Sequence, residues 1–106
     1  MSADQAGPQL EVTWDPHKAQ SNLAKHGVSF AQAATVLLDP LALTVFDDAH
    51  SEFEERWFTL GNSTDARLLA VSHTYSATGP NSAKVRVISA REATRQERRQ
   101  YENESR

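Results

Sequence analysis

Apolar and polar residues alternate in short runs along this chain, and each run predicts a strand or a helix. The run from Leu10 to Trp14 alternates with a period of two, which is typical of a short strand. Asp15-Pro16 then predicts a helix start, because aspartate accepts hydrogen bonds at an N-cap and proline fits the first helical position. Gly27 can adopt the left-handed backbone conformation that commonly follows a helix end, so we predict a helix from Pro16 to His26.

A second helix is predicted to open at Ser29, because Gln32 follows three residues later and completes a capping box. Asp39-Pro40 ends this helix, since the residue before a proline disfavours helical backbone. Its apolar residues recur at helical spacing and should face the core: Phe30, Ala33, Ala34 and Leu37.

The rest of the chain predicts four further strands and a last helix. Gly79-Pro80-Asn81 indicates that the segment 76–83 is a turn. Thr94 opens the last helix, which should run to Ser105 with Glu97 as the partner in a second capping box. The four strands are Leu41–Phe46, Arg56–Leu60, Arg67–Tyr75 and Lys84–Ala90.

The order of these elements predicts an α+β fold. Consecutive strands joined by short loops pair in antiparallel fashion. Helices grouped before and after such a run pack on the sheet as a layer. We therefore expect two N-terminal helices and one C-terminal helix on an antiparallel β-sheet. The 106 residues suffice for one domain, placed at 10–106, with residues 1–9 as a disordered lead-in.

The last predicted helix is polar on nearly every side. Tyr101 is its only large apolar residue, so core packing alone would hold it weakly. Ion pairs four residues apart, such as Arg98 with Glu102, are one way to stabilise it. The other interpretation is that this helix is a contact surface for a partner.

Composition excludes several classes of protein. The chain has no cysteine, which excludes a disulfide scaffold, a thiolate metal site and a cysteine nucleophile. No apolar run approaches the roughly 20 residues that span a bilayer. The first eight residues carry neither a basic residue nor a hydrophobic stretch, so a signal peptide is not expected. The expected location is the cytoplasm.

Charge is distributed unevenly around a net charge of −3. The segment 39–55 has six acidic residues and no basic one, whereas the segment 84–99 has six basic residues against two acidic ones. Both segments are consistent with solvated surface. The alternative is that the C-terminal half forms a basic face that binds an anion such as RNA.

The first predicted helix carries a polar stripe of Lys18, Asn22 and Lys25. This stripe is either an exposed, solubilising surface or a surface that faces phosphate groups. Ala19, Leu23 and His26 form the neighbouring stripe, which should face the core. His26 is best explained as a structural histidine near the helix C-terminus. The expected RNA ligand on this helix is Lys25.

The densest group of catalytic residue types is His50, Glu54 and Arg56. Imidazole and carboxylate groups can transfer protons in phosphoryl chemistry, and a guanidinium can stabilise charge that develops on phosphate oxygens. The plainer interpretation is a polar hairpin loop that leads into a strand. Arg86 and Arg91 lie five residues apart, so in a regular strand they would point to opposite faces.

Metal and cofactor chemistry find little support in the sequence. The four histidines have no ligand-like spacing, and the four glycines are too scattered for a phosphate-binding loop. A ribonuclease needs neither a metal nor a cofactor, because the RNA 2′-hydroxyl can attack its own phosphate. No metal site and no cofactor are therefore expected.

Five segments of the chain together match the pattern of a known family. They are Trp14-Asp15-x-x-Lys18-Ala19-x-x-Asn22-Leu23-x-Lys25-His26-Gly27-Val28-x-Phe30, Asp39-Pro40-Leu41-Ala42, His50-Ser51-x-x-Glu54-x-Arg56, Leu60-Gly61, and Val87-Ile88-Ser89-Ala90-Arg91-x-Ala93-Thr94-x-x-Glu97-x-x-x-Tyr101-Glu102. Through these segments, over about nine-tenths of its length, the chain resembles the BrnT toxin family. The resemblance implies a small relative of the RelE-type ribonuclease toxins, which halts translation by cutting RNA. It also implies a partner antitoxin with a ribbon-helix-helix domain, which would read operator DNA and repress the operon.

The leading hypothesis is accordingly a metal-independent endoribonuclease toxin. Arg56 and Arg91 are expected to converge on a concave surface and to stabilise the transition state, while His50 and Glu54 transfer protons. The remaining site residues are assigned in two groups: Lys25, Arg67 and Arg86 bind RNA, and Arg95, Arg98 and Tyr101 bind the antitoxin.

Two other hypotheses remain open. In the first, the chain is a weak or inactive enzyme whose main role is to hold the antitoxin as a transcriptional co-repressor, which the negative net charge and the polar last helix favour. In the second, it is a stand-alone RNA-binding domain. That hypothesis requires exposed aromatic side chains for base stacking, for which Trp57 and Tyr75 are the candidates.

Overall fold

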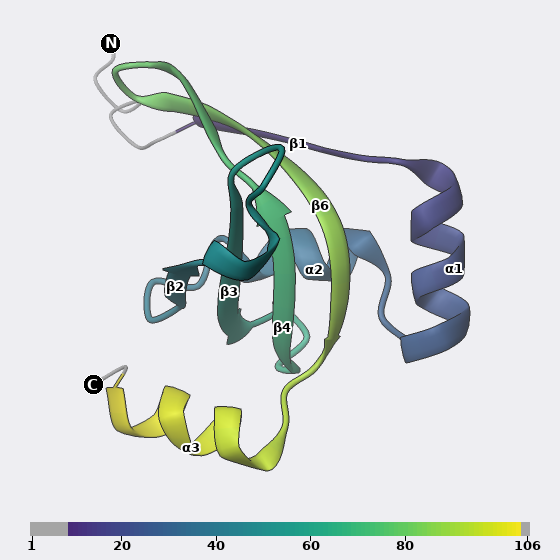
Figure 1. Cartoon of the computed structure of the whole chain (residues 1–106). Coiled ribbons are helices and arrows are strands. Elements are labelled where there is room, and N and C mark those ends of the chain that lie inside the picture. Colours follow the sequence, from purple (N-terminus) through teal and green to yellow (C-terminus); the bar gives the residue numbers. More distant parts are fainter. Residues whose placement is uncertain (1–8, 105–106) are drawn as a thin grey trace, which may run out of the picture.

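Three helices and one six-stranded sheet make up the part of the chain that the computed structural model describes, residues 9–104 (Figure 1). A short 3-10 turn, η2 (Asp48–His50), interrupts the connection between two of the strands. The elements follow in the order β1 (Gln9–Trp14), α1 (Pro16–His26), α2 (Phe30–Val36), β2 (Leu43–Phe46), β3 (Arg56–Asn62), β4 (Leu68–Thr74), β5 (Ser76–Gly79), β6 (Ser82–Glu92) and α3 (Arg95–Glu104). The α+β class is therefore confirmed.

The sheet is mixed rather than purely antiparallel. Its strand order is β1-β6-β4-β3-β2, with β5 paired to β6. Pairing is antiparallel throughout except between β1 and β6, which run parallel from Gln9 opposite Ser82 to Trp14 opposite Val87. The expectation of antiparallel pairing is wrong here because β1 and β6 are not consecutive. A crossover through the helices and the other strands separates them, as a parallel pair requires.

The segment 76–83 is a hairpin with a strand of its own and not only the turn that was predicted. Ser76–Gly79 forms β5 and pairs with β6 from Ser82 onward, which leaves only Pro80 and Asn81 as the connection. All four residues of β5 are exposed, so no apolar pattern marks this strand in the sequence. The expected disordered lead-in lies outside the described residues, apart from Gln9, which already belongs to β1.

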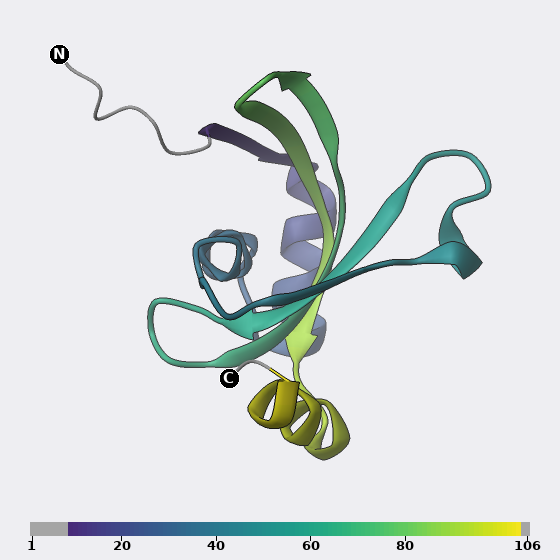
Figure 2. The same ribbon diagram turned by 90° about the vertical axis from the view of Figure 1, so that its left-hand side faces the viewer.

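Helices α1 and α2 cover one face of the sheet, and α3 packs under one end of the opposite face (Figure 2). We call the first the helix face and the second the open face. The helix-face core contains buried residues of α2, β4 and β6: Phe30, Ala33, Val36, Leu69, Val71, Val87 and Ala90, together with Val28. The smaller open-face core consists of Leu60, Leu68, Ala70 and Tyr101.

Helix α1 begins and ends where the sequence predicts, but the expected capping hydrogen bond of the Asp15 side chain is wrong, because Asp15 is the N-cap residue through its backbone alone. Gly27 has a φ of 69° and its N–H donates to the Leu23 carbonyl, which closes α1. The Ser29 side chain accepts from the Gln32 N–H at 3.0 Å, and the Gln32 side chain accepts in return from the Ser29 N–H at 3.0 Å. Thr94 and Glu97 form the same reciprocal pair at the start of α3. Both predicted capping boxes are confirmed.

Asn22 is buried, which contradicts its place in an exposed polar stripe. Its side-chain amide donates to the Ala90 carbonyl at 2.8 Å and to the Val28 carbonyl at 3.0 Å, and it accepts from the Ala90 N–H at 3.1 Å. Strand β1 ends opposite Val87, so the edge of β6 has no strand partner at Ala90. The amide of Asn22 replaces that partner and fastens α1 to the sheet.

The core-facing stripe predicted for α1 is correspondingly wrong in part. Ala19 packs against the helix-face core, but Leu23 is 51% exposed and His26 is also exposed. The helix is rotated so that Asn22 points inward, because a buried amide can bond the open backbone edge and a leucine cannot. Hydrogen bonding, rather than apolar content, sets the orientation of this helix.

Helix α3 is held by a few specific contacts. Tyr101 is only 9% exposed, and its hydroxyl donates to Asp39 Oδ2 at 2.6 Å and accepts from Asn62 Nδ2 at 3.2 Å. Asp39 Oδ2 also accepts from the Asn62 N–H at 2.8 Å. This network needs glycine at position 61, where a Cβ would lie 3.1 Å from Asp39 Oδ2 and 3.0 Å from the Ala42 Cβ.

Replacing Asn22 should destabilise the fold strongly. Asn22→Ala removes three hydrogen bonds and leaves the Ala90 N–H and carbonyl without partners, so the free energy of unfolding should fall by about 3 kcal/mol. Leu23→Ala, on the exposed side of the same helix, is the matched control and should change it by less than about 1 kcal/mol. Urea unfolding measures both values. An equal loss of unfolding free energy in the two variants would contradict the role of Asn22 in fastening α1 to the sheet.

Candidate functional site

The connection between β2 and β3 gathers three of the four residues predicted to be catalytic. His50, Glu54 and Arg56 line one cavity of about 250 Å³, together with Ala49, Glu52 and Phe53. Ser51 closes the loop, because its hydroxyl donates to the Asp47 carbonyl at 2.5 Å and accepts from the Arg56 N–H at 3.0 Å. The Asp47 N–H donates to the Arg56 carbonyl at 2.8 Å. The loop is therefore fixed to the first residue of β3.

Two guanidinium groups meet at one carboxylate beside this cavity. Glu54 Oε1 lies 2.5 Å from Nη2 of Arg86 and 3.8 Å from Nη2 of Arg56. Arg56 stands opposite Thr74 in the sheet, and the Thr74 hydroxyl accepts from the Arg86 N–H at 3.0 Å. Arg56 and Arg86 thus come from β3 and β6, on either side of β4. The carboxylate of Glu54 forms ion pairs with both guanidiniums.

A β-bulge in β6 places Arg86 on the open face. Ser89 pairs with Ser72 and Val87 pairs with His73, so β6 has one more residue than β4 at Ile88. An extra residue shifts the alternation of side chains by one position. Arg86 and Arg91 therefore share the open face, and the expectation that they point to opposite faces is wrong.

His50 is oriented by a residue that the sequence reasoning missed. Its Nδ1 lies 3.0 Å and 3.2 Å from the two carboxylate oxygens of Asp47. A proton shared with the carboxylate at Nδ1 leaves Nε2 as the basic nitrogen of the ring. The sequence signal for this pair is the spacing of three residues between Asp47 and His50, which one helical turn brings together.

Arg91 does not converge with Arg56. It pairs with Ala70, four residues before Thr74, so the two arginines are about 13 Å apart along β4 and on different sides of it. The Arg91 guanidinium binds both carboxylate oxygens of Glu97, at 2.8 Å and 3.0 Å. These bonds raise the pKa of Arg91 and lower that of Glu97. The capping box of α3 presents Glu97 to Arg91, and the expected convergence is wrong.

The other predicted RNA ligands lie away from the Arg56–Arg86 pair. Arg67 bonds Glu92 Oε2 at 2.9 Å and the Gly27 carbonyl at 3.1 Å, so its guanidinium links β6 to the end of α1. Lys25 lines a cavity of about 210 Å³ beside the bulge of β6. The lining of that cavity also includes Lys18, His26, Ile88 and Ser89.

The predicted antitoxin contacts divide between surface and core. Arg95 and Arg98 are exposed on α3, and Arg99 is exposed beside them. Tyr101 faces the sheet and is buried in the open-face core. Its side chain anchors the helix and does not present itself to a partner on the outer side of α3.

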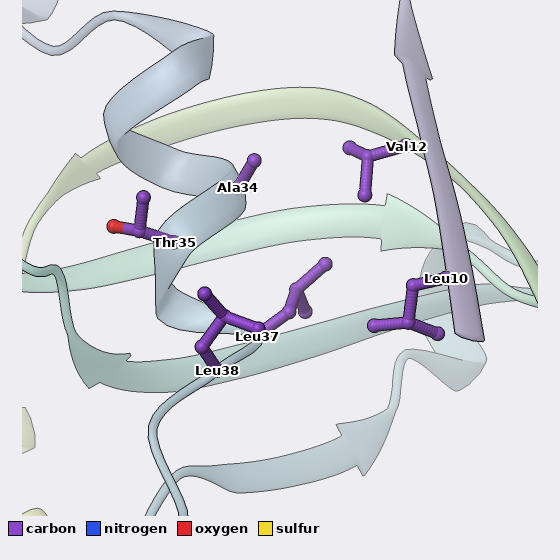
Figure 3. Close-up of a pocket in the computed structure, with 6 residues that line it drawn as sticks. All are labelled: Leu10, Val12, Ala34, Thr35, Leu37 and Leu38. Carbon is purple, nitrogen blue, oxygen red and sulfur yellow. The ribbon is translucent and has the colours of Figure 1, made fainter. Parts of the chain in front are cut away.

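Two further cavities lie on the helix face. One, of about 520 Å³, separates β1 from α2 and is lined by Leu10, Val12, Ala34, Thr35, Leu37 and Leu38 (Figure 3). Its single hydroxyl belongs to Thr35, which already donates to the Gln32 carbonyl, so the cavity holds no group for acid–base chemistry. The other, of about 200 Å³, is lined by Thr44, Trp57, His73 and Tyr75.

His73 is buried and uncharged at the floor of the second cavity. Its Nδ1 donates to the Thr74 carbonyl at 2.9 Å, so its Nε2 accepts from the Thr59 hydroxyl at 2.7 Å. Burial lowers the pKa of His73, because a protonated imidazole would lose its hydration there. This imidazole is a structural group rather than a proton carrier.

Comparison with known proteins decides the family. Residues 14–97 match the family model described as "Ribonuclease toxin, BrnT, of type II toxin-antitoxin system". This chain belongs to the BrnT family. The crystal structure of the Brucella abortus ribonuclease toxin BrnT superposes with a TM-score of 0.58 and 27% sequence identity, over 82% of this chain and 100% of that one. Among curated proteins, none matches the chain.

BrnT membership makes the chain a ribonuclease toxin by family and implies an antitoxin as its partner. The solved relative supports the α+β fold, whereas the expected kinship with RelE-type toxins stays an expectation. In residues 9–104 of this BrnT-family chain, no helix is long and apolar enough to cross a membrane. The same residues contain no cluster of three His, Cys, Asp or Glu side chains suited to a metal ion.

The buried His73 should make the stability of the BrnT-family chain depend on pH. The pKa of His73 is lower in the folded state than its ordinary value of 6.5, so the unfolded chain takes up a proton first as the pH falls. The free energy of unfolding should decrease as the pH falls through 6.5, by at most about 1.4 kcal/mol per pH unit.

Urea unfolding at several pH values checks this dependence. His73→Asn keeps a hydrogen-bonding side chain that does not titrate, and it should flatten the pH profile. His26→Asn, at an exposed histidine, should leave the profile as it is. An unchanged slope in His73→Asn would show that another group carries the dependence.

Proposed function

We propose that this BrnT-family chain is itself an endoribonuclease that cleaves RNA without a metal ion and thereby inhibits translation. The observation that carries the proposal is the pair of guanidinium groups, Arg56 and Arg86, that meet at Glu54 beside the Asp47–His50 pair. This arrangement suits a phosphate group, because two guanidiniums can bind its oxygens and an imidazole can transfer protons beside it. Because its substrate would be cellular RNA, the proposed place of action is the cytoplasm.

The proposed reaction is an internal transesterification of RNA. His50 Nε2 removes the proton of a 2′-hydroxyl, whose oxygen attacks the adjacent phosphorus. The bond from phosphorus to the 5′-oxygen breaks, and that oxygen receives a proton from solvent, to which His50 later returns the proton that it removed. The products are a 2′,3′-cyclic phosphate and a 5′-hydroxyl. Arg56 and Arg86 stabilise the negative charge that builds up on the phosphorus oxygens, as preorganised cations do in other phosphoryl transfers.

Glu54 takes two successive roles in this proposal. Without RNA, its carboxylate neutralises both arginines and holds them in place. A phosphate that binds between the arginines must displace this carboxylate, because both anions need the same donors. The released carboxylate then lies close enough to share proton transfer with His50, since both residues line one cavity.

The remaining arginines and lysines receive supporting roles. Arg86 joins Arg56 at the phosphate in the place first expected for Arg91. Arg91 acts through Glu97 by holding α3 against the sheet. Lys25, with Lys18 beside it, is proposed to bind flanking phosphates. Arg67 is proposed to contribute to RNA binding only indirectly, because Glu92 and the Gly27 carbonyl already engage its guanidinium.

The proposed antitoxin has a ribbon-helix-helix domain and reads operator DNA on behalf of the complex. The exposed Arg95 and Arg98 of α3 offer it a positively charged surface that an acidic segment would complement. Tyr101 would contribute only by fixing α3 in position.

A second candidate function is that of an antitoxin-bound co-repressor with weak or no catalysis. The specific observation in its favour is that Glu54 already neutralises the two arginines in the free chain, whose net charge is −3. RNA binding must then overcome both the local ion pairs and the overall repulsion. A cleavage assay on the chain alone separates the two functions.

The purified chain should cleave single-stranded RNA in the presence of a chelator. Arg56→Ala and Arg86→Ala should each lower the cleavage rate by about 100- to 1,000-fold, because each removes one cation from the charged transition state. Arg91→Lys keeps a positive charge at the α3 anchor and should retain cleavage within about 10-fold. Gel analysis of a labelled RNA, with the 2′,3′-cyclic phosphate as the product, measures all three rates.

Intact RNA in the wild-type reaction, with normal growth of cells that express the chain alone, would overturn the proposed ribonuclease activity. The co-repressor function would then be the remaining candidate. Activity that appears only after a divalent metal is added back would refute metal independence. If a folded Arg91→Lys variant loses as much of the cleavage rate as Arg86→Ala does, Arg91 would have to be counted among the catalytic residues.

Glu54→Gln separates proton transfer from positioning. Glutamine keeps the size of the side chain but cannot accept a proton, so a role in catalysis predicts a loss of about 100-fold or more in the cleavage rate. Glu52→Gln, at a neighbouring acid that lines the same cavity, is the matched control and should change the rate little. A rate that equals or exceeds the wild type in Glu54→Gln would limit Glu54 to holding the arginines.

A further inference from the structure

The cavity between β2, β3 and β4 on the helix face has aromatic walls. Trp57 and Tyr75 line it, with Thr44 at its rim and His73 at its floor. Phe46 packs edge-on against Trp57, with ring centroids 5.1 Å apart and an angle of 73° between the planes. Tyr75 is 48% exposed and Phe46 is 42% exposed, so both rings present apolar surface to solvent.

The interior of this cavity is apolar and uncharged. His73 stays neutral, and both of its ring nitrogens are already hydrogen-bonded. The Thr59 hydroxyl donates to His73, so it accepts from the Thr44 hydroxyl at 2.9 Å, and that bond uses the Thr44 proton. The cavity therefore suits a flat, apolar group better than a charged or strongly polar one.

The aromatic cavity and the Arg56–Arg86 pair lie at the same end of the sheet. Arg56 and Trp57 are consecutive in β3, and Thr74 and Tyr75 are consecutive at the end of β4. In the register of the sheet Arg56 faces Thr74, and Trp57 faces His73. Since successive side chains of a strand point to opposite faces, one end of the sheet presents cations on the open face and aromatic rings on the helix face.

A nucleotide joins the same two kinds of group, a charged phosphate and a flat base. We infer that the cavity of Thr44, Trp57, His73 and Tyr75 binds a base of the RNA by stacking, next to the nucleotide whose phosphate lies between Arg56 and Arg86. This inference rests on the proposed function and names a second binding site for the same substrate. Base stacking on aromatic side chains tolerates every base, because each base has a flat π surface.

The first experiment uses Trp57 as its own reporter. Trp14→Phe removes the only other tryptophan, which packs against Phe30 at a centroid distance of 6.2 Å. The probe is a short single-stranded RNA with every 2′-hydroxyl methylated, so that it cannot attack its own phosphate. A base that stacks on Trp57 should quench its fluorescence. An abasic oligonucleotide of the same length and charge should bind without this quenching.

The second experiment measures affinity for the same probe. Tyr75→Ala should weaken binding about 10-fold, because one aromatic ring that stacks on a base is lost. Tyr75→Phe keeps the ring and should restore the affinity to within about 2-fold of the wild type. Leu38→Ala, at a 70% exposed apolar residue in the turn after α2, controls for the loss of apolar surface and should have no effect.

Each outcome decides the inference independently of the proposed function. Quenching that depends on the base, with weaker binding in Tyr75→Ala alone, supports the base site. Absence of quenching, or unchanged affinity in a folded Tyr75→Ala, overturns the base site, and the proposed function survives if the wild type still cleaves RNA. Weaker binding of the antitoxin but not of the RNA in Tyr75→Ala also overturns it and assigns the cavity to a protein interface.

Discussion

One extra residue in β6 determines how this molecule presents its charges. The bulge at Ile88 puts Arg86 on the same face as Arg56, and Glu54 bridges the two. A regular strand would point Arg86 to the helix face, away from Arg56 and Glu54. Just beyond the bulge, the amide of Asn22 bonds the open edge of β6 and fixes α1. The bulged strand thus connects the candidate site to the packing of the helices.

Much of the resemblance to the toxin family rests on residues that build the fold. Asn22 secures α1, while Asp39, Gly61 and Tyr101 form the contact that holds α3. Arg91 belongs with them through its ion pair with Glu97. The segment from His50 to Arg56 differs, because its side chains line an open cavity and its loop is fixed by Ser51. Many of the residues shared with the family therefore stabilise the fold, whereas the residues of the proposed chemistry lie mainly in the connection between β2 and β3.

Local signals made most of the fold predictable, and long-range pairing made the rest unpredictable. Capping boxes, Gly27 and the alternation in β3 depend on residues a few positions apart, so the sequence carries them directly. The bulge at Ile88, the parallel pairing of β1 and the inward turn of Asn22 depend on contacts between distant segments, such as the 68 residues between Asn22 and Ala90 or the pairing of Gln9 with Ser82. For the site, the cluster of His50, Glu54 and Arg56 was predictable as neighbours, but its joining to Arg86 required the sheet register.

The account depends on phosphate replacing Glu54 between two arginines, and a crystal structure with a 2′-O-methylated RNA oligonucleotide tests this most directly. The account predicts a phosphate group bonded to the guanidiniums of Arg56 and Arg86, with the Glu54 carboxylate moved away from both. A structure in which the RNA lies along Arg95, Arg98 and Arg99 of α3, with Glu54 still bonded to Arg86, would contradict it.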